Sequence, residues 1–455
     1  MIKSVSPPVR TLDLLGDISP VRTGKYVAPA SVDRVTLGEA WPRQKQTVRP
    51  AAASGVHPVK VVHRLPSQLG GWTELLRDAD PHFVQRDFLP QQVQKNPEIV
   101  AAFGTATPPS GDVLLHYAGD PPAGVPVHPV PVILVHGATK DGRFFWDPKE
   151  DGSNDGPAVT LHAQGYQVYA VTFAHNQDDN NVQAQQVMNA IQRVKALAGV
   201  PQVDLVGHSK GGVPVHVVGS PSFREPWMTP YQNDVRRIGL IASPNGGIDY
   251  SFRHPCGNTA LNLLPFNAPM SWDRVNIGFW SVGTGEKGFG ADGAYPGQGQ
   301  LLDRWDKTYP LPMFEFTDGW TSYTTYHGGQ SWFSHSQGIE AAMEESGQFM
   351  PRLEAAPMDP HIEVGLLAGN RANIPSILNE STGPSDGLLF VKSALLAPAG
   401  AKVVEADVLP LHHKAVVSDP AGQKWLSDFL GAPPREGMSD AALAEVERRG
   451  EETAA

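Results

Sequence analysis

The sequence predicts an α/β fold in which helices flank a mostly parallel sheet. Six short apolar runs are rich in β-branched residues, which is typical of strands covered on both faces. Stretches with helical spacing separate several of these runs, and such alternation predicts βαβ units. The predicted strands are residues 130–135, 168–173, 203–206, 238–242, 362–367 and 403–409.

Helices are expected between the strands and near the end of the chain. The clearest signal comes from Val182, Val187 and Ile191, which begin a run of apolar residues at helical spacing. Another helix would directly follow the third strand. The expected helices are residues 158–165, 182–197, 211–218 and 440–449.

The chain of 455 residues divides into parts by composition. Residues 1–127 contain many prolines and little periodicity, so we expect an irregular N-terminal extension with some helix within residues 71–103. Residues 128–432 would form the main α/β domain, and a polar tail, residues 433–455, would follow it.

A long insertion separates the fourth and fifth predicted strands. Fifteen aromatic residues lie between Leu261 and Glu345, a density about twice the 8% of the whole chain. A connection of this length is unusual inside a compact unit. We therefore expect an aromatic-rich cap over about residues 250–360 rather than a plain loop.

Composition excludes several classes of protein. The formal net charge of −11 argues against a nucleic-acid partner, which would favour a basic face. A single cysteine, Cys256, excludes an internal disulfide framework and a thiolate metal cluster. No apolar run has the roughly 20 residues of a membrane span or resembles a signal peptide. The expected location is the cytoplasm, with secretion after removal of a leader as the alternative.

A nucleophile motif follows the third predicted strand. Gly207, Ser209 and Gly211 form the pattern Gly-x-Ser-x-Gly between a strand and a helix-compatible stretch. That context is the one in which a sharp strand-to-helix turn exposes a serine hydroxyl. Ser209 is therefore the candidate nucleophile.

A serine hydroxyl needs a base, and the base needs an acid that orients it. Asp386 lies beyond the fifth strand and His413 beyond the sixth, at the sheet edge where α/β proteins carry their sites. They are the predicted acid and base. Asp249 is the second choice for the acid, and His412 is the alternative base.

Two backbone amides would bind the negative oxygen that forms when the serine attacks a carbonyl. One is the N–H of Lys210, directly after the nucleophile, and the other is the N–H of Ala138. Gly137 permits the close turn at the end of the first strand. His136 is expected to be a structural hydrogen-bonding residue.

The sequence predicts no cofactor and no metal. Within the acidic stretch 147–156, residues 151–156 resemble part of a calcium loop, but a calcium loop needs a glutamate at its twelfth position. Counted from Asp151, that position is His162. We therefore expect a solvated acidic loop. The polar stretch 175–180 is expected at the mouth of the site.

Together these motifs resemble the α/β-hydrolase fold, and within it bacterial triacylglycerol lipases and lipase-like polyhydroxyalkanoate depolymerases. The resemblance spans about residues 129–430 and includes the segments 132–137, 203–212, 244–247, 385–388 and 413–417. It implies Ser209 as nucleophile, Asp386 as acid, His413 as base, and Ala138 and Lys210 as oxyanion donors. A lysine at position 210 departs from the apolar or amide residue usual in lipases, and would place a cation beside the acyl pocket.

The expected function is hydrolysis of carboxylic esters through an acyl-enzyme on Ser209. Apolar acyl esters, as small molecules or polymers, are the expected substrates because an aromatic cap would give an apolar binding surface. One alternative is an acyltransferase or thioesterase that uses the same acyl-enzyme. Another, from a different class, is a non-catalytic binding protein with this fold.

Overall fold

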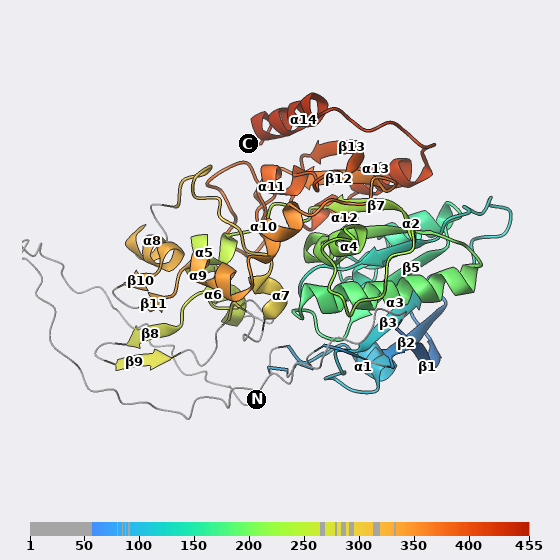
Figure 1. Ribbon diagram of the computed structural model, residues 1–455, viewed down its shortest axis with the longest axis horizontal. Helices are drawn as coiled ribbons and strands as arrows, with labels where there is room; N and C mark the ends of the chain where they lie inside the picture. The colour runs from blue at the N-terminus through green and yellow to red at the C-terminus, as the bar shows by residue number, and fades with distance from the viewer. Residues whose placement is uncertain are drawn as a thin grey trace, which may run out of the picture. The chain divides into compact units, whose positions relative to one another are not determined.

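A computed structural model describes most of the chain from residue 57 to residue 454 (Figure 1). Residues 80, 84, 87, 90–91, 264–268, 278–279, 284–287, 291–294, 313–318 and 332–333 are outside the description. So are residues 1–56 of the expected extension. Of the aromatic residues expected in the cap, the following also lie outside the described residues: Phe266, Phe279, Phe314, Phe316, Trp332 and Phe333.

A nine-stranded sheet forms the centre of the described chain. From one edge to the other the strands are β1 (Val59–Pro66), β2 (Trp72–Asp78), β3 (Asp112–Tyr117), β5 (Val168–Phe173), β4 (Val132–Val135), β6 (Val203–His208), β7 (Val235–Ile241), β12 (Glu363–Gly369) and β13 (Lys402–Leu409). Neighbours from β5 to β13 are parallel, whereas β1, β2 and β3 pair antiparallel and join the sheet at β5. All six predicted strands are confirmed, and so is the fold class.

Helices cover both faces of this sheet (Figure 1). Strand β4 shows why, because its side chains alternate between two apolar cores. Ile133 and Val135 pack with α3 and α4, whereas Val132 and Leu134 pack with α2 and α13. The helices of this part are α2 (Pro157–Ala163), α3 (Asn180–Ala198), α4 (Gly212–Gly219), α11 (Val391–Leu395), α12 (Ala415–Ser418), α13 (Pro420–Gly431) and α14 (Asp440–Glu452), with the 3-10 turns η1 (Gly142–Phe145) and η2 (Ser209–Gly211).

Some helix lies within residues 71–103, as expected, but only at the end of this stretch. Leu75 and Leu76 lie in strand β2, and both are buried because this strand is covered on both faces. Helix α1 is limited to Pro97–Phe103, where the Asn96 side chain accepts a hydrogen bond from the first turn and Gly104 ends it in the left-handed region. Strands β1 to β3 also lie in the expected extension, so these three segments are not irregular as predicted. The boundary at residue 127 stays a prediction.

The insertion between β7 and β12 has its own structure. Its core includes Phe252, Phe289 and Tyr326. The helices are α5 (Tyr250–Arg253), α6 (Pro255–Leu263), α7 (Pro296–Gly299), α8 (Gly319–His327), α9 (Ile339–Glu345) and α10 (Phe349–Glu354). A second sheet has the order β10 (Gly329–Gln330), β11 (Ser334–Ser336), β8 (Arg274–Ile277) and β9 (Trp280–Gly283). An apolar core distinguishes this segment, called the cap below, from a loop. Its limits at residues 250 and 360 stay a prediction.

The predicted C-terminal helix is confirmed as α14, and it packs on the main domain. A Cβ at Gly450 would lie 2.5 Å from a methyl carbon of Val408, so the helix approaches β13 closely. The Asn370 side chain donates to the Gly450 carbonyl oxygen at 2.9 Å. None of the helices in the described part of the chain is both long and apolar enough to cross a membrane.

Candidate active site

Ser209 occupies a strained turn between β6 and α4. Its φ of 54° lies in the left-handed region, which non-glycine residues rarely adopt. The flanking glycines are sterically required. A Cβ at Gly207 would lie 2.5 Å from the Gly212 Cα, and one at Gly211 would lie 2.3 Å from the Val135 carbonyl oxygen. The Gly-x-Ser-x-Gly spacing thus lets the chain reverse and present the serine at the carboxyl edge of the sheet.

The structure brings the three predicted side chains together. His413 Nε2 lies 2.8 Å from Ser209 Oγ, and His413 Nδ1 lies 2.7 Å from Asp386 Oδ2. Asp386 is 1% exposed and His413 is 5% exposed. The remaining oxygen, Asp386 Oδ1, accepts the backbone N–H groups of Leu388 and Leu389 at 3.0 and 2.8 Å. The carboxylate is therefore held on both sides, by two amides and by the imidazole.

His208 helps to hold His413 in place, a role that the sequence did not predict. Its Nε2 donates to the His413 carbonyl oxygen at 3.1 Å, and the His413 N–H donates to the Asp386 carbonyl oxygen at 2.9 Å. Burial lowers the pKa of His208 to about 3, so this ring stays neutral near pH 7. Only its place beside the nucleophile in the sequence could have pointed to this role.

The alternative acid and base lie elsewhere. The Asp249 carboxylate is bound by Arg253 at 2.7 Å and by the Tyr326 hydroxyl at 2.8 Å. His412 Nδ1 faces the backbone N–H of Ala415, at 3.4 Å, at the start of α12. These contacts favour Asp386 and His413.

The segment after β4 lies directly against the serine. A Cβ at Gly137 would be 2.7 Å from Ser209 Cβ and 3.2 Å from Ser209 Oγ, so only glycine fits. Within the described residues the next N–H, that of Ala138, donates no hydrogen bond. The Lys210 N–H belongs to the first turn of η2, where backbone donors have no partner within the helix. Both amides are thus available to an incoming oxygen.

His136 is a structural residue, as expected. Its Nδ1 donates to the Gly137 carbonyl oxygen at 2.8 Å, and its Nε2 accepts the Phe173 N–H at 3.2 Å. Burial lowers the pKa of His136 to about 4, which keeps the ring neutral. A neutral ring can donate through Nδ1 and accept through Nε2 at the same time. The ring thus fixes the turn that carries Gly137 and Ala138.

The Lys210 side chain is held by polar partners near the start of α3, and its expected place beside the acyl pocket stays a prediction. It is 2% exposed, and its ammonium donates to the Gln183 side chain and, at 3.4 Å, to the Asp178 carbonyl oxygen. Burial lowers the pKa of Lys210 to about 7, although Asp178 and Asp179 oppose this effect. The Lys210 side chain is therefore held at the N-terminal end of α3.

The polar stretch 175–180 is mostly buried rather than open at the mouth of a site. Asp178 and Gln177 are each 1% exposed. The cap covers them, since the Gly297 N–H donates to the Gln177 carbonyl oxygen at 3.0 Å and the Asn180 side chain donates to the Gly297 carbonyl oxygen at 3.1 Å. This stretch therefore joins the cap to the main domain.

Residues 147–156 form a mostly exposed acidic segment. Lys149 pairs with Asp155, and His162 bonds to the Asp120 carbonyl oxygen at 2.9 Å. Among the described residues there is no group of three or more His, Cys, Asp or Glu side chains that could hold a metal ion. The expectation of no cofactor stays a prediction.

Comparison with known proteins gives one family match and several solved structures of low similarity. The sequence model of the lipase (class 2) family matches residues 129–220, which include Ser209. A lipase from Bacillus licheniformis, BlEst2 in its mature form, is 14% identical, with 70% of this chain and 96% of that chain covered and a TM-score of 0.37. The carboxylesterase CesB from Bacillus subtilis is 12% identical, with coverages of 77% and 93% and a TM-score of 0.33.

The strand order and the family match agree with each other. The nucleophile turn follows β6 in the middle of a mostly parallel sheet, and the matched segment runs from the start of β4 to the end of α4. The match over residues 129–220 supports an enzyme that acts on esters, and the chain has the α/β-hydrolase fold, as the resemblance in its sequence implied.

Proposed function

We propose that the protein is a serine hydrolase of carboxylic esters that works through an acyl-enzyme on Ser209. The observation that carries the proposal is the unbroken line of hydrogen bonds from Asp386 through His413 to the Ser209 hydroxyl, at 2.7 and 2.8 Å. Each side chain has the role that this chemistry requires of a nucleophile, a base and an orienting acid.

In the proposed mechanism Ser209 Oγ attacks the ester carbonyl carbon while His413 Nε2 takes the hydroxyl proton. The carbonyl oxygen becomes negative and accepts the N–H groups of Ala138 and Lys210, each worth about 3 kcal/mol to the transition state. His413 then gives its proton to the leaving alcohol. The acyl-enzyme remains, and a water molecule activated by His413 releases the acid and frees Ser209.

Esters with an apolar acyl group, as small molecules or polyesters, are the proposed substrates. The family match to lipases supports this class. The aromatic residues of the insertion support it too, because apolar and aromatic side chains line most sites for such ligands. In this proposal residues 128–432 form the catalytic domain, with the cap at about residues 250–360.

Turnover of p-nitrophenyl esters tests the proposal. Wild type should hydrolyse a short-chain ester, and Ser209→Ala should lower kcat by about 10⁴-fold or more, since the residual rate then comes from oxyanion binding alone. Circular dichroism should show both proteins folded. Equal turnover by the two proteins, or no turnover of any ester by folded wild type, would contradict the proposal.

A further inference from the structure

The loop that carries Asp386 is closed by the main chain of Glu380. The Glu380 N–H donates to the Gly387 carbonyl oxygen at 2.8 Å, and the Glu380 carbonyl oxygen accepts the Ser385 hydroxyl at 2.5 Å. The Ser385 hydroxyl also accepts the Gly387 N–H at 3.1 Å. Because Ser385 and Gly387 flank Asp386, the position of Glu380 sets the position of the carboxylate between them.

The Glu380 side chain is 1% exposed and turns toward the cap. Its Oε1 accepts the backbone N–H and the hydroxyl of Thr382 at 2.7 and 2.6 Å. Its Oε2 lies 2.9 Å from His254 Nε2 and 3.6 Å from Arg253 Nε, and both residues belong to the first cap segment. Burial alone would raise the pKa of Glu380, but the hydrogen bond from His254 and the nearby Arg253 keep it lowered, so this carboxyl is ionised near pH 7.

Arg253 joins the same loop to the cap. Its side chain is fully buried and forms an ion pair with Asp249 at 2.7 Å. Its Nη1 donates to the Thr382 hydroxyl at 3.1 Å and to the carbonyl oxygen of Pro310 in the cap at 2.7 Å. The Thr382 hydroxyl thus accepts from Arg253 and donates to Glu380, which makes one continuous chain of polar contacts.

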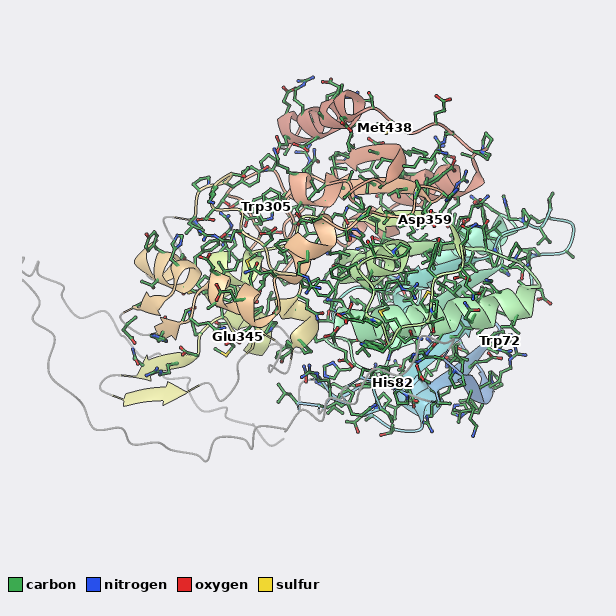
Figure 2. The ribbon with its side chains drawn as sticks, in the orientation of Figure 1. Trp72, His82, Trp305, Glu345, Asp359 and Met438 are labelled. Atoms are coloured by element: carbon green, nitrogen blue, oxygen red, sulfur yellow. The ribbon has the colours of Figure 1, made fainter. Side chains whose placement is uncertain are left out.

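The other end of the loop meets the same guanidinium. The Arg253 guanidinium carbon lies 5.1 Å from the ring centre of Phe390, whose backbone bridges to Ser385. Phe390 stacks on Tyr309 of the cap at 4.2 Å between ring centres. Trp305, labelled in Figure 2, packs 5.8 Å from the Phe390 ring and donates to the Gly246 carbonyl oxygen at 3.0 Å. Cap residues therefore hold both ends of the loop that carries Asp386, residues 380–390, which is called the acid loop below.

We propose that Glu380 and Arg253 are positioning residues that make the geometry of the Asp386–His413 pair depend on the cap. Neither touches Ser209 or substrate in this scheme. They act by holding the acid loop, and the inference rests on the proposed function of the triad. A shift of about 1 Å in a catalytic group can cost about 100-fold in rate, so a modest loosening of this loop would be measurable.

Glu380→Gln is the sharpest variant because it keeps the shape of the side chain. The backbone N–H and the hydroxyl of Thr382 both donate to Glu380 Oε1, so the amide oxygen of the glutamine should take the place of Oε1. The amide NH₂ then faces Arg253 and His254 instead of a carboxylate oxygen. We expect kcat, and the rate of labelling by a fluorophosphonate, to fall by about 10–100-fold, with KM within about twofold of wild type. Thr382→Val, which removes only the bridging hydroxyl, should show a smaller loss in the same direction.

Glu363→Gln is the matched control. Glu363 also pairs with a buried arginine, Arg237, at 2.8 Å, but it begins β12, at the end of the sheet opposite the site. Loss of this pair should lower the melting temperature and leave the labelling rate and kcat unchanged. A proton NMR spectrum adds a readout that needs no turnover: the strongly downfield signal of the His413 Nδ1 proton should weaken in Glu380→Gln and persist in Glu363→Gln.

The outcomes separate this inference from the proposed function. The positioning role is wrong if folded Glu380→Gln labels as fast as wild type and keeps the downfield signal. It is also wrong if Glu363→Gln loses as much labelling rate and kcat as Glu380→Gln. If Glu380→Gln does not fold, Thr382→Val decides by the same criteria. If wild type itself resists labelling, the proposed function fails, and the downfield signal still shows whether Glu380 holds the pair.

Discussion

Asp386→Asn is expected to lower kcat by about 10⁴-fold with little change in KM. Two backbone donors, the N–H groups of Leu388 and Leu389, face Asp386 Oδ1 and will hold the amide oxygen of the asparagine there. The amide NH₂ must then face His413 Nδ1, which becomes an acceptor. The proton moves to Nε2, and this nitrogen can no longer accept the Ser209 hydroxyl proton.

Steady-state kinetics on a p-nitrophenyl ester measures this effect. Asp204→Asn is a suitable control, because Asp204 is as fully buried, pairs with Arg236, and lies near the start of β6, away from the nucleophile. The control should lose stability and keep kcat. A loss below about tenfold in Asp386→Asn would mean that another group orients His413.

Gly137→Ala is expected to lower kcat/KM by at least about 100-fold while the protein still folds. The added methyl would lie 2.7 Å from Ser209 Cβ and 3.1 Å from the His208 carbonyl oxygen, so the serine or the turn after β4 must shift. Either shift separates the hydroxyl from His413 or moves the Ala138 N–H away from the developing oxyanion.

Gly239→Ala is the control for that substitution. It places the same methyl on the neighbouring part of the sheet, in β7, where the nearest atoms of Phe429 and Val206 are 3.6 Å away. This is ordinary contact, and activity should be unchanged. Wild-type kcat/KM in Gly137→Ala would show that the turn is not held against the serine as the structure has it.

The sequence allowed prediction of those features that depend on nearby residues. The nucleophile turn could be found because the steric demands at Gly207 and Gly211 act within a few residues of Ser209. Asp386 and His413 could be found because parallel strands bring their carboxyl ends to one edge of the sheet. Strand β4 was recognisable because burial on both faces requires a continuous apolar run.

Other features depend on contacts between distant segments and gave no local signal. The Lys210 side chain lies against Gln183 and the cap, and neither contact is implied by the motif around it. The Arg253–Glu380 contact joins the end of α5 in the cap to the loop after β12. Leu75 and Leu76 fit a loose helical spacing, but pairing with β3 made their segment a strand.

The most direct test of the proposed chemistry is to identify the residue that a fluorophosphonate modifies. After reaction of the full-length protein, peptide mapping by mass spectrometry should find one adduct, on Ser209, and Ser209→Ala should carry none. Modification of a different serine, or an unmodified Ser209 in folded and active protein, would contradict the assignment of Ser209 as the nucleophile.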